Sequence, residues 1–304
     1  MTAVAVSPAG LLAGLRPPPG RDAAPAFDGG WVVDGAGGRA PFVAYLDAGA
    51  EGWSAELEAL HVDSSLEHPI DVLTRATAVA ALRGARLGAR PSLIDVGCSS
   101  GHLLADLRAQ WPAAALAGVD AEASGLPAAH AAVPDAALFH ASATDLPFAD
   151  GVADALVALN LLEHLPDDVA ALAEFARVLR PGGRAVVVVP ANPRLYDYYD
   201  EHLRHERRYG RDEVPERARA AGLVPVASTA VGSVVYPAFW AVKTRNRRRC
   251  LSPGEARARV ERDIARSSSS PLARAAFRLE AGLLRRGVRP RRGIRQAVVL
   301  ERAA

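Results

Sequence analysis

Short apolar runs alternate with amphipathic stretches through the middle of the chain. The runs that predict buried strands cover residues 93–96, 116–119, 137–140, 155–159 and 185–189. The spacing of apolar residues between these runs predicts helices over residues 102–110, 124–132 and 167–179. Such alternation is typical of a mainly parallel sheet covered by helices, in which ligands bind at the carboxyl ends of the strands.

Towards the C-terminus the alternation continues and is then interrupted. A helix is expected over residues 211–221, ended by Gly222, and a sixth strand over residues 223–231. The seventh strand is expected only at residues 296–301, antiparallel to the sixth. The sequence therefore predicts an α/β fold with a Rossmann-like, doubly wound sheet of seven strands, mainly parallel with the last strand antiparallel.

The N-terminal part has a different pattern. Residues 1–40 are rich in Ala, Gly and Pro and predict loops, with a short strand at residues 31–33. Residues 53–83 predict two helices that cap the ligand site, the first with Leu57 and Leu60 on one face. The expected organisation is an N-terminal extension and helical cap over residues 1–90, a core over 91–231, a basic insertion over 232–292 and the final core strand over 293–304.

A glycine turn follows the first expected strand of the core. Gly97 and Gly101 lack a Cβ, so the main chain there can adopt positive φ and approach a ligand closely, and Ser99 adds a hydroxyl group. The G-x-x-x-G spacing differs from the G-x-G-x-x-G of dinucleotide sites. The next strand ends in Asp120, about 20 residues beyond the turn, where an acid can bind a ribose diol. Together these features predict an adenosyl ligand.

With these residues the chain resembles the class I S-adenosylmethionine-dependent methyltransferases. Residues 95–101, Asp-Val-Gly-Cys-Ser-Ser-Gly, match the first motif of that family, and residues 144–155, 160–166 and 178–190 are similar to its later motifs in the same order. The resemblance implies S-adenosylmethionine as cofactor. The cofactor-binding residues that it implies are Asp95, Gly97, Cys98, Ser99, Gly101, Asp120, Ser142, Ala143 and Asn160.

Each of these residues is expected to contact a particular part of the cofactor. Gly97, Ser99 and Gly101 would border the methionine part, Asp120 the ribose, and Asn160 the methyl end. Ser142 and Ala143 would flank the adenine. The family often carries an acidic residue where this chain has Ser142. Because one such contact contributes only about 0.5–1.5 kcal/mol, the site is expected to tolerate the hydroxyl group.

Residues 195–209 are unusually rich in titratable and aromatic side chains. Asp200, His205, Arg208 and Tyr209 match a D-x-x-x-x-H-x-R-R-Y pattern of one subgroup of these methyltransferases. In the catalytic interpretation His205 is a general base, with His202 a weaker competitor, and Arg208 and Tyr209 orient the substrate. In the structural interpretation Arg208 and Asp200 form an ion pair that orients the following helix, and His205 caps it.

Glu163 and His164 follow Asn160, close to the expected methyl end of the cofactor. Either they have a functional role because they lie near the methyl group, or they are a structural pair that starts a helix and organises the loop. The eight histidines and two cysteines show no paired zinc spacing, so no metal is predicted.

The formal net charge of +2 gives no overall signature of nucleic-acid binding. The motif Asn/Asp-Pro-Pro-Tyr of base methyltransferases is absent, so a nucleic-acid partner is not expected. Local basic clusters are present at Arg245, Arg247, Arg248, Arg249, Arg285, Arg286, Arg289, Arg291 and Arg292. Such clusters can bind an anionic substrate or an anionic membrane surface, or they can simply form the solvated face of a helix.

No signal peptide, disulfide framework or apolar run of about 18–20 residues is apparent, which favours a cytoplasmic protein without a transmembrane segment. Peripheral membrane contact and the oligomeric state stay open.

The expected function is methyl transfer to an oxygen or nitrogen atom of a small molecule. One alternative is an NAD(P)-dependent reductase, although the middle glycine of its turn is missing. The other is a non-catalytic binding or assembly protein that keeps the cofactor pocket.

Overall fold

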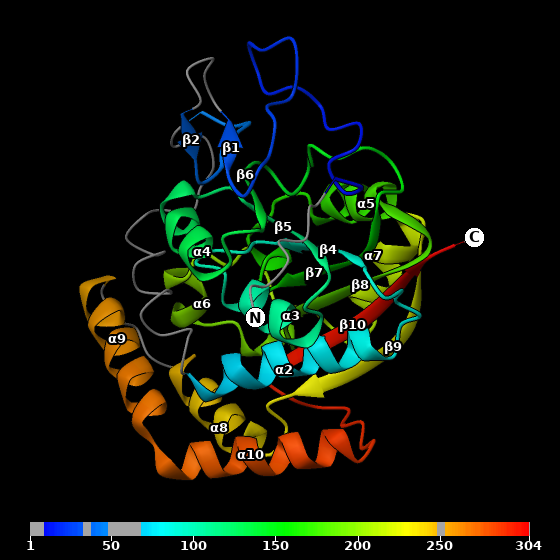
Figure 1. Cartoon of the computed structure of the whole chain (residues 1–304). Coiled ribbons are helices and arrows are strands. Elements are labelled where there is room, and N and C mark those ends of the chain that lie inside the picture. Colours follow the sequence, from blue (N-terminus) through cyan, green and yellow to red (C-terminus); the bar gives the residue numbers. More distant parts are fainter. Residues whose placement is uncertain (1–8, 33–37, 48–67, 248–252, 304) are drawn as a thin grey trace.

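The computed structural model of the chain describes residues 9–32, 38–47, 68–247 and 253–303. Its centre is a sheet of eight strands, of which β10 runs antiparallel to both β8 and β9 while the other seven run in one direction (Figure 1). The strands in spatial order are β3 (Val43–Ala44), β6 (Ala137–His140), β5 (Ala115–Asp120), β4 (Ser92–Val96), β7 (Ala153–Leu159), β8 (Leu179–Pro190), β10 (Arg295–Arg302) and β9 (Leu223–Val231). The mainly parallel, Rossmann-like sheet is therefore confirmed.

The expected count of seven strands is wrong by one, because the N-terminal extension adds β3 at the edge. Val43 pairs in parallel register with Phe139 of β6. Trp31 holds the extension there, since its side chain is fully buried and its Nε1 donates to the carbonyl of Leu138 at 2.9 Å. Trp31 belongs to a separate pair of short strands, β1 (Trp31–Val32) and β2 (Arg39–Ala40). A two-residue strand is too short to leave a periodic signal in the sequence.

Helices cover both faces of the sheet because successive strand residues point to opposite sides. One face packs against α2 (Pro69–Arg83), α3 (His102–Gln110) and α4 (Leu126–Ala132). The other packs against α5 (Asp168–Val178) and α7 (Glu213–Ala220). The expected helix carrying Leu57 and Leu60 lies outside the described residues.

Between β9 and β10, at the place of the expected insertion, the described residues form three helices. They are α8 (Tyr236–Asn246), α9 (Pro253–Ser269) and α10 (Pro271–Arg285). Figure 1 shows α10 running alongside α2, and Phe277 packs in one apolar cluster with Ile70 and Leu73. The buried carboxylate of Glu280 accepts the backbone N–H groups of residues 232–234 at 2.8–3.0 Å. The insertion is thus fastened to the core, and the boundaries at residues 90, 231 and 292 stay proposals.

Short helical elements stand near the ends of β7 and β8. They are the 3-10 turns η2 (Leu162–His164) and η3 (Pro193–Leu195), and the helix α6 (Tyr198–His202). Another 3-10 turn, η1 (Ala123–Gly125), precedes α4, which begins only where Pro127 can occupy the first helical turn. Among the described residues, no helix combines the length and the apolar character that a membrane span requires.

Candidate functional site

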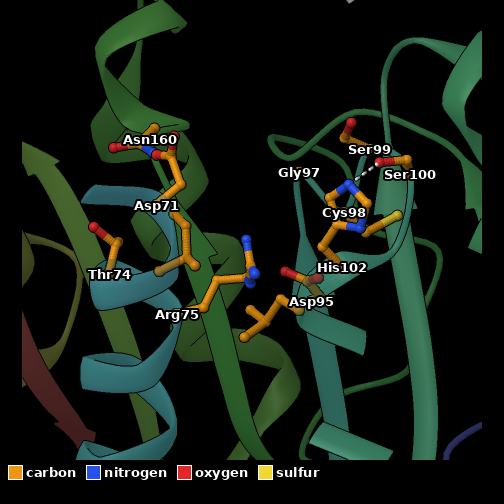
Figure 2. Close-up of a pocket in the computed structure, with 12 residues that line it drawn as sticks. Asp71, Thr74, Arg75, Asp95, Gly97, Cys98, Ser99, Ser100, His102 and Asn160 are labelled. Carbon is orange, nitrogen blue, oxygen red and sulfur yellow. Dashed lines mark hydrogen bonds between the residues drawn. The ribbon is translucent and has the colours of Figure 1, made fainter. Parts of the chain in front are cut away.

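A pocket opens at the carboxyl ends of β4 and β7. Figure 2 shows that α2 forms one wall of this pocket and the turn between β4 and α3 forms the opposite wall. The lining residues are Asp71, Thr74, Arg75, Asp95, Gly97, Cys98, Ser99, Ser100, His102, Leu103, Leu159 and Asn160. Five of the predicted cofactor-binding residues are among them, namely Asp95, Gly97, Cys98, Ser99 and Asn160. The structure thus gathers residues that lie up to 65 positions apart in the sequence.

The turn has the conformation that its glycines predict. Gly97 and Gly101 both have φ near +79°. A Cβ on Gly101 would lie 2.8 Å from the Cα of Ala129 in α4, so the turn and that helix meet backbone to backbone. Ser99 also has positive φ, and its N–H donates to Asp120 Oδ2 at 2.7 Å. Asp120 therefore holds the turn in place from the end of the neighbouring strand.

Asp120 has a second structural contact, since its Oδ1 accepts the N–H of Glu122 at 2.9 Å. A carboxylate has about four acceptor sites, so Asp120 can hold both backbone groups and still bind a ribose diol. Ser142 and Ala143 are buried just beyond β6, at the same edge of the sheet. Ser142 Oγ lies 2.9 Å from Thr144 Oγ1. Neither residue is among those that line the pocket, so their contact with adenine stays a prediction.

Asp95 is the buried acidic group of the pocket. Its side chain is only 2% exposed, and its Oδ2 has no hydrogen-bond partner among the described residues. Burial, and then the neighbouring charge of Asp120, raise the pKa of Asp95 to about 8. A buried carboxylate of this kind is destabilised unless a positive charge compensates it. The pocket is therefore suited to a ligand that brings a cation to Asp95.

The helix α2 supplies pocket residues that sequence reasoning missed, namely Asp71, Thr74 and Arg75. Arg75 Nε donates to Asp106 Oδ2 at 2.8 Å and brings a positive charge to the pocket. Arg295, at the start of β10, donates to Asp71 Oδ1 at 2.6 Å and to Thr74 Oγ1 at 2.8 Å. The only sequence signal was that these polar residues interrupt the apolar face of a predicted cap helix.

Asp200 is the centre of the segment that matches the D-x-x-x-x-H-x-R-R-Y pattern. It is fully buried and accepts from His205 Nδ1 at 3.0 Å, Arg208 Nε at 2.7 Å and Lys243 Nζ at 2.9 Å. Burial alone would raise the pKa of Asp200, but the hydrogen bond from His205 and the charges of Arg208 and Lys243 together hold it below its usual range. The ion pair of the structural interpretation is thus present. His205 does not cap the following helix, whose N-cap is Asp212.

Tyr209 lies in the hydrophobic core, away from the pocket lining. Its side chain is fully buried, and its hydroxyl donates to Asp168 Oδ2 at 2.6 Å and lies 3.0 Å from the carbonyl oxygen of Leu162. Burial, followed by the bond to Asp168, raises the pKa of Tyr209 well above its usual value. We therefore remove Tyr209 from the catalytic candidates. The pattern could not reveal this because Asp168 comes from a different element.

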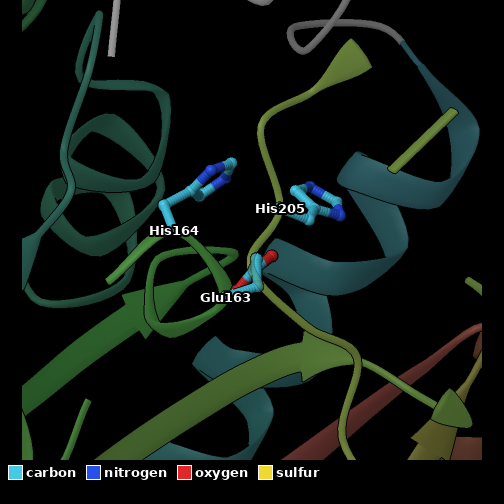
Figure 3. A group of neighbouring side chains, drawn as sticks. All are labelled: Glu163, His164 and His205. Carbon is cyan, nitrogen blue, oxygen red and sulfur yellow. The ribbon is translucent and has the colours of Figure 1, made fainter. Parts of the chain in front are cut away.

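His205 approaches Glu163 and His164, as Figure 3 shows. One donor atom from each of the three side chains lies within 4.8 Å of the other two. Burial raises the pKa of Glu163 to about 8, and burial also lowers the pKa of His205 despite its bond to Asp200. The sequence placed Glu163 and His164 together but gave no sign that His205 joins them.

Comparison with known proteins identifies the fold and the domain. Residues 94–187 match the family described as "Methyltransferase domain". The chain is 32% identical over 145 residues to trans-aconitate 2-methyltransferase of Azoarcus sp. strain BH72, covering 48% of this chain and 54% of that protein. It is 32% identical over 143 residues to the ubiquinone/menaquinone biosynthesis C-methyltransferase UbiE of Syntrophotalea carbinolica, covering 44% and 59%. The chain thus spans little more than half the length of these relatives.

A solved structure extends the likeness over more of the chain. A chain in the Haloferax volcanii complex between the Trm112 methyltransferase activator and a methyltransferase superposes with a TM-score of 0.57 at 20% identity. The superposition covers 83% of this chain and all of that one, and it shows the fold alone. Residues 94–187 thus match a methyltransferase domain, and the sheet topology and this solved structure show the Rossmann-like fold that the resemblance to class I S-adenosylmethionine-dependent methyltransferases implies.

Proposed function

We propose that the chain binds S-adenosylmethionine in the pocket between α2 and the β4–α3 turn and transfers its methyl group to a small-molecule acceptor. The observation that carries this proposal is the buried carboxyl group of Asp95 beside a glycine turn, because its Oδ2 has no hydrogen-bond partner among the described residues. S-Adenosylmethionine carries a sulfonium and an ammonium group, either of which would compensate Asp95. Arg75 provides a positive charge in the same pocket for the carboxylate of the methionine part.

The remaining cofactor residues follow from their places along the sheet edge. Asp120 would bind the ribose, with Ser142 and Ala143 near the adenine and Asn160 at the methyl end. Methyl transfer from a sulfonium is an in-line displacement, which gains most from holding donor and acceptor in near-attack geometry without water. A good nucleophile needs no dedicated acid or base, so the pocket can promote methyl transfer mainly by holding donor and acceptor in place.

For contact with the methyl acceptor, His205 is a better candidate than Arg208. Arg208 is 6% exposed, and its guanidinium group is bonded to Asp200 and to the carbonyl oxygen of Ala191. His205 gives only its Nδ1 to Asp200, which directs the other ring nitrogen away from that carboxylate. The relatives named above include a C-methyltransferase, so the preference for an oxygen or nitrogen acceptor is the finer part of this proposal.

Calorimetric titration with S-adenosylhomocysteine and, separately, with NADPH tests the cofactor. We expect S-adenosylhomocysteine to bind and Asp120→Ala to weaken its binding by about 10-fold to 100-fold, the effect of losing charged hydrogen bonds of about 1.5–3 kcal/mol. Asp135→Ala, a carboxylate that pairs with Arg108, should bind like the wild type. Binding of NADPH alone would indicate the reductase, and binding of neither ligand would remove the cofactor from the proposal. Turnover of S-adenosylmethionine with candidate acceptors then distinguishes an enzyme from a binding protein.

A further inference from the structure

The contact between His205 and the pair Glu163–His164 is built by backbone hydrogen bonds. The N–H of Glu206 donates to the carbonyl oxygen of Glu163 at 2.7 Å, which fastens the chain next to His205 onto η2. The hydroxyl of Tyr196 donates to the carbonyl oxygen of His205 at 2.7 Å. His205 is therefore held from both sides at a fixed place relative to Glu163.

Glu163 turns an unpaired carboxylate oxygen into this cluster. The residue is 1% exposed, and its Oε2 has no hydrogen-bond partner among the described residues. Figure 3 shows Glu163 beside the two imidazole rings, which contact each other edge to face with their centroids 4.8 Å apart. A structural helix-start pair would not require a buried carboxylate oxygen without a partner, because such an atom costs free energy unless a cation or a donor satisfies it. The geometry thus provides an acceptor that lacks a partner.

Asp200 orients His205 in the way that carboxylates orient metal-binding histidines. Its Oδ1 accepts from His205 Nδ1 at 3.0 Å, which leaves Nε2 as the nitrogen that can coordinate an ion. Asp200 is itself held by Arg208 and Lys243. Buried ion pairs of this kind fix the position of the carboxylate, and through it the orientation of the ring.

We propose that Glu163, His164 and His205 bind a divalent first-row transition-metal ion, with Asp200 as the outer carboxylate that positions His205. Two imidazoles and one carboxylate are a donor set for Zn²⁺ or a similar ion rather than for Mg²⁺ or Ca²⁺, which prefer oxygen ligands. Donors at about 2.1 Å from a tetrahedral ion are about 3.4 Å apart. The cluster, whose donors lie within 4.8 Å of one another, therefore needs to close by up to about 1.4 Å, which side-chain rotation can supply.

Three protein donors leave at least one position of a four-coordinate ion for water or another ligand. Glu163 lies three residues beyond Asn160, which lines the pocket. In this assignment His205 is a metal ligand rather than a free base. The proposal concerns the metal site itself and holds whether or not the chain transfers methyl groups.

The test uses the whole chain, expressed without a polyhistidine tag and freed of metal with a chelator. Titration with Co²⁺ is followed by its visible absorption, and titration with Zn²⁺ by calorimetry and by the shift of the melting temperature. We expect one equivalent of ion to bind, with the absorption of a four-coordinate nitrogen and oxygen site. Glu163→Gln and His205→Gln should each weaken binding by about tenfold or more and abolish most of the thermal shift.

His202→Ala is the matched control, because His202 is a histidine of the same segment that does not belong to the cluster. It should bind the ion like the wild type. The two glutamine variants are examined separately by circular dichroism, so that loss of folding in one leaves the other as the test. Absence of Co²⁺ and Zn²⁺ binding in the folded wild type would overturn the proposal. Binding that survives in a folded Glu163→Gln or His205→Gln variant would also overturn it.

Discussion

The buried carboxyl group of Asp95 should make the stability of the folded chain depend on pH. Its pKa is about 8 in the folded protein but about 3.9 in an unfolded chain. Between these values the folded state holds a proton that the unfolded state has lost, so the free energy of unfolding falls as pH rises, by up to about 1.4 kcal/mol per pH unit. Urea denaturation at pH 5, 6, 7 and 8 measures this slope. Asp95→Asn, which cannot ionise, should lose the contribution of this residue and gain stability relative to the wild type as pH rises.

The exposed Asp22 provides the control for this comparison. Asp22→Asn should follow the wild-type pH profile, because its side chain stays in water in both states. Parallel profiles for the wild type and Asp95→Asn would show that Asp95 is ionised at neutral pH in the folded protein. Burial would then not raise the pKa of Asp95 to about 8, and its negative charge would be present before any cationic ligand binds.

Individual residues of the cofactor turn were predictable from the sequence because their constraint is local. A strand that runs directly into a helix requires positive φ at Gly97 and Gly101, and both glycines have it. The surroundings of Tyr209 and Asp200 were not predictable in this way. Asp168 binds the Tyr209 hydroxyl, and Lys243 binds Asp200, from 41 and 43 positions away. A sequence pattern shows which residue types occur together but not which of them a distant element buries.

At the scale of elements, the salt bridges of Lys243 join α8 to α6. Lys243, the single lysine of the chain, is 4% exposed and lies 2.5 Å from Asp197 Oδ1 and 2.9 Å from Asp200 Oδ2. Lys243→Met keeps much of the side-chain volume but leaves two buried carboxylates without this cation. We expect the free energy of unfolding to fall by about 3–5 kcal/mol, the usual cost of removing one partner from a buried ion pair. Urea denaturation at neutral pH measures the loss.

Arg245→Met is the matched variant, because Arg245 lies on the same helix with an exposed side chain. Its effect should stay within about 0.5 kcal/mol, as for most surface substitutions. Equal effects of the two variants would mean that the ion pairs of Lys243 add nothing beyond the general contribution of a basic residue on α8.

Elements with a strong local pattern were predicted closely. The sixth strand was expected over residues 223–231, which are the bounds of β9, and β10 extends the expected seventh strand by one residue at each end. The strand β3 was missed because it exists only through pairing with β6. The helices α8, α9 and α10 were anticipated only as a basic insertion. Their arrangement depends on contacts with α2 and α6, which no local pattern encodes.

At the scale of the whole molecule, distant parts of the chain build one pocket. The wall formed by α2 comes from the N-terminal part, the turn and Asn160 come from the core, and Arg295 of the last strand holds Asp71 and Thr74. The predicted cap helix and the predicted turn were each recognisable alone. Their juxtaposition was not, because it is set by the packing of α2 against the sheet and α10.

A ligand in such a pocket should stabilise both walls and not the glycine turn alone. Saturation with S-adenosylhomocysteine is expected to slow amide hydrogen exchange in α2, around residues 71–75, as well as in residues 97–101. Exchange in α9, whose residues are absent from the pocket lining, should change little and serves as the internal reference. Hydrogen exchange read by mass spectrometry with and without the ligand measures all three segments. Protection confined to residues 97–101 would mean that α2 does not contact the bound ligand, and the role of Arg75 in holding its carboxylate would be lost with it.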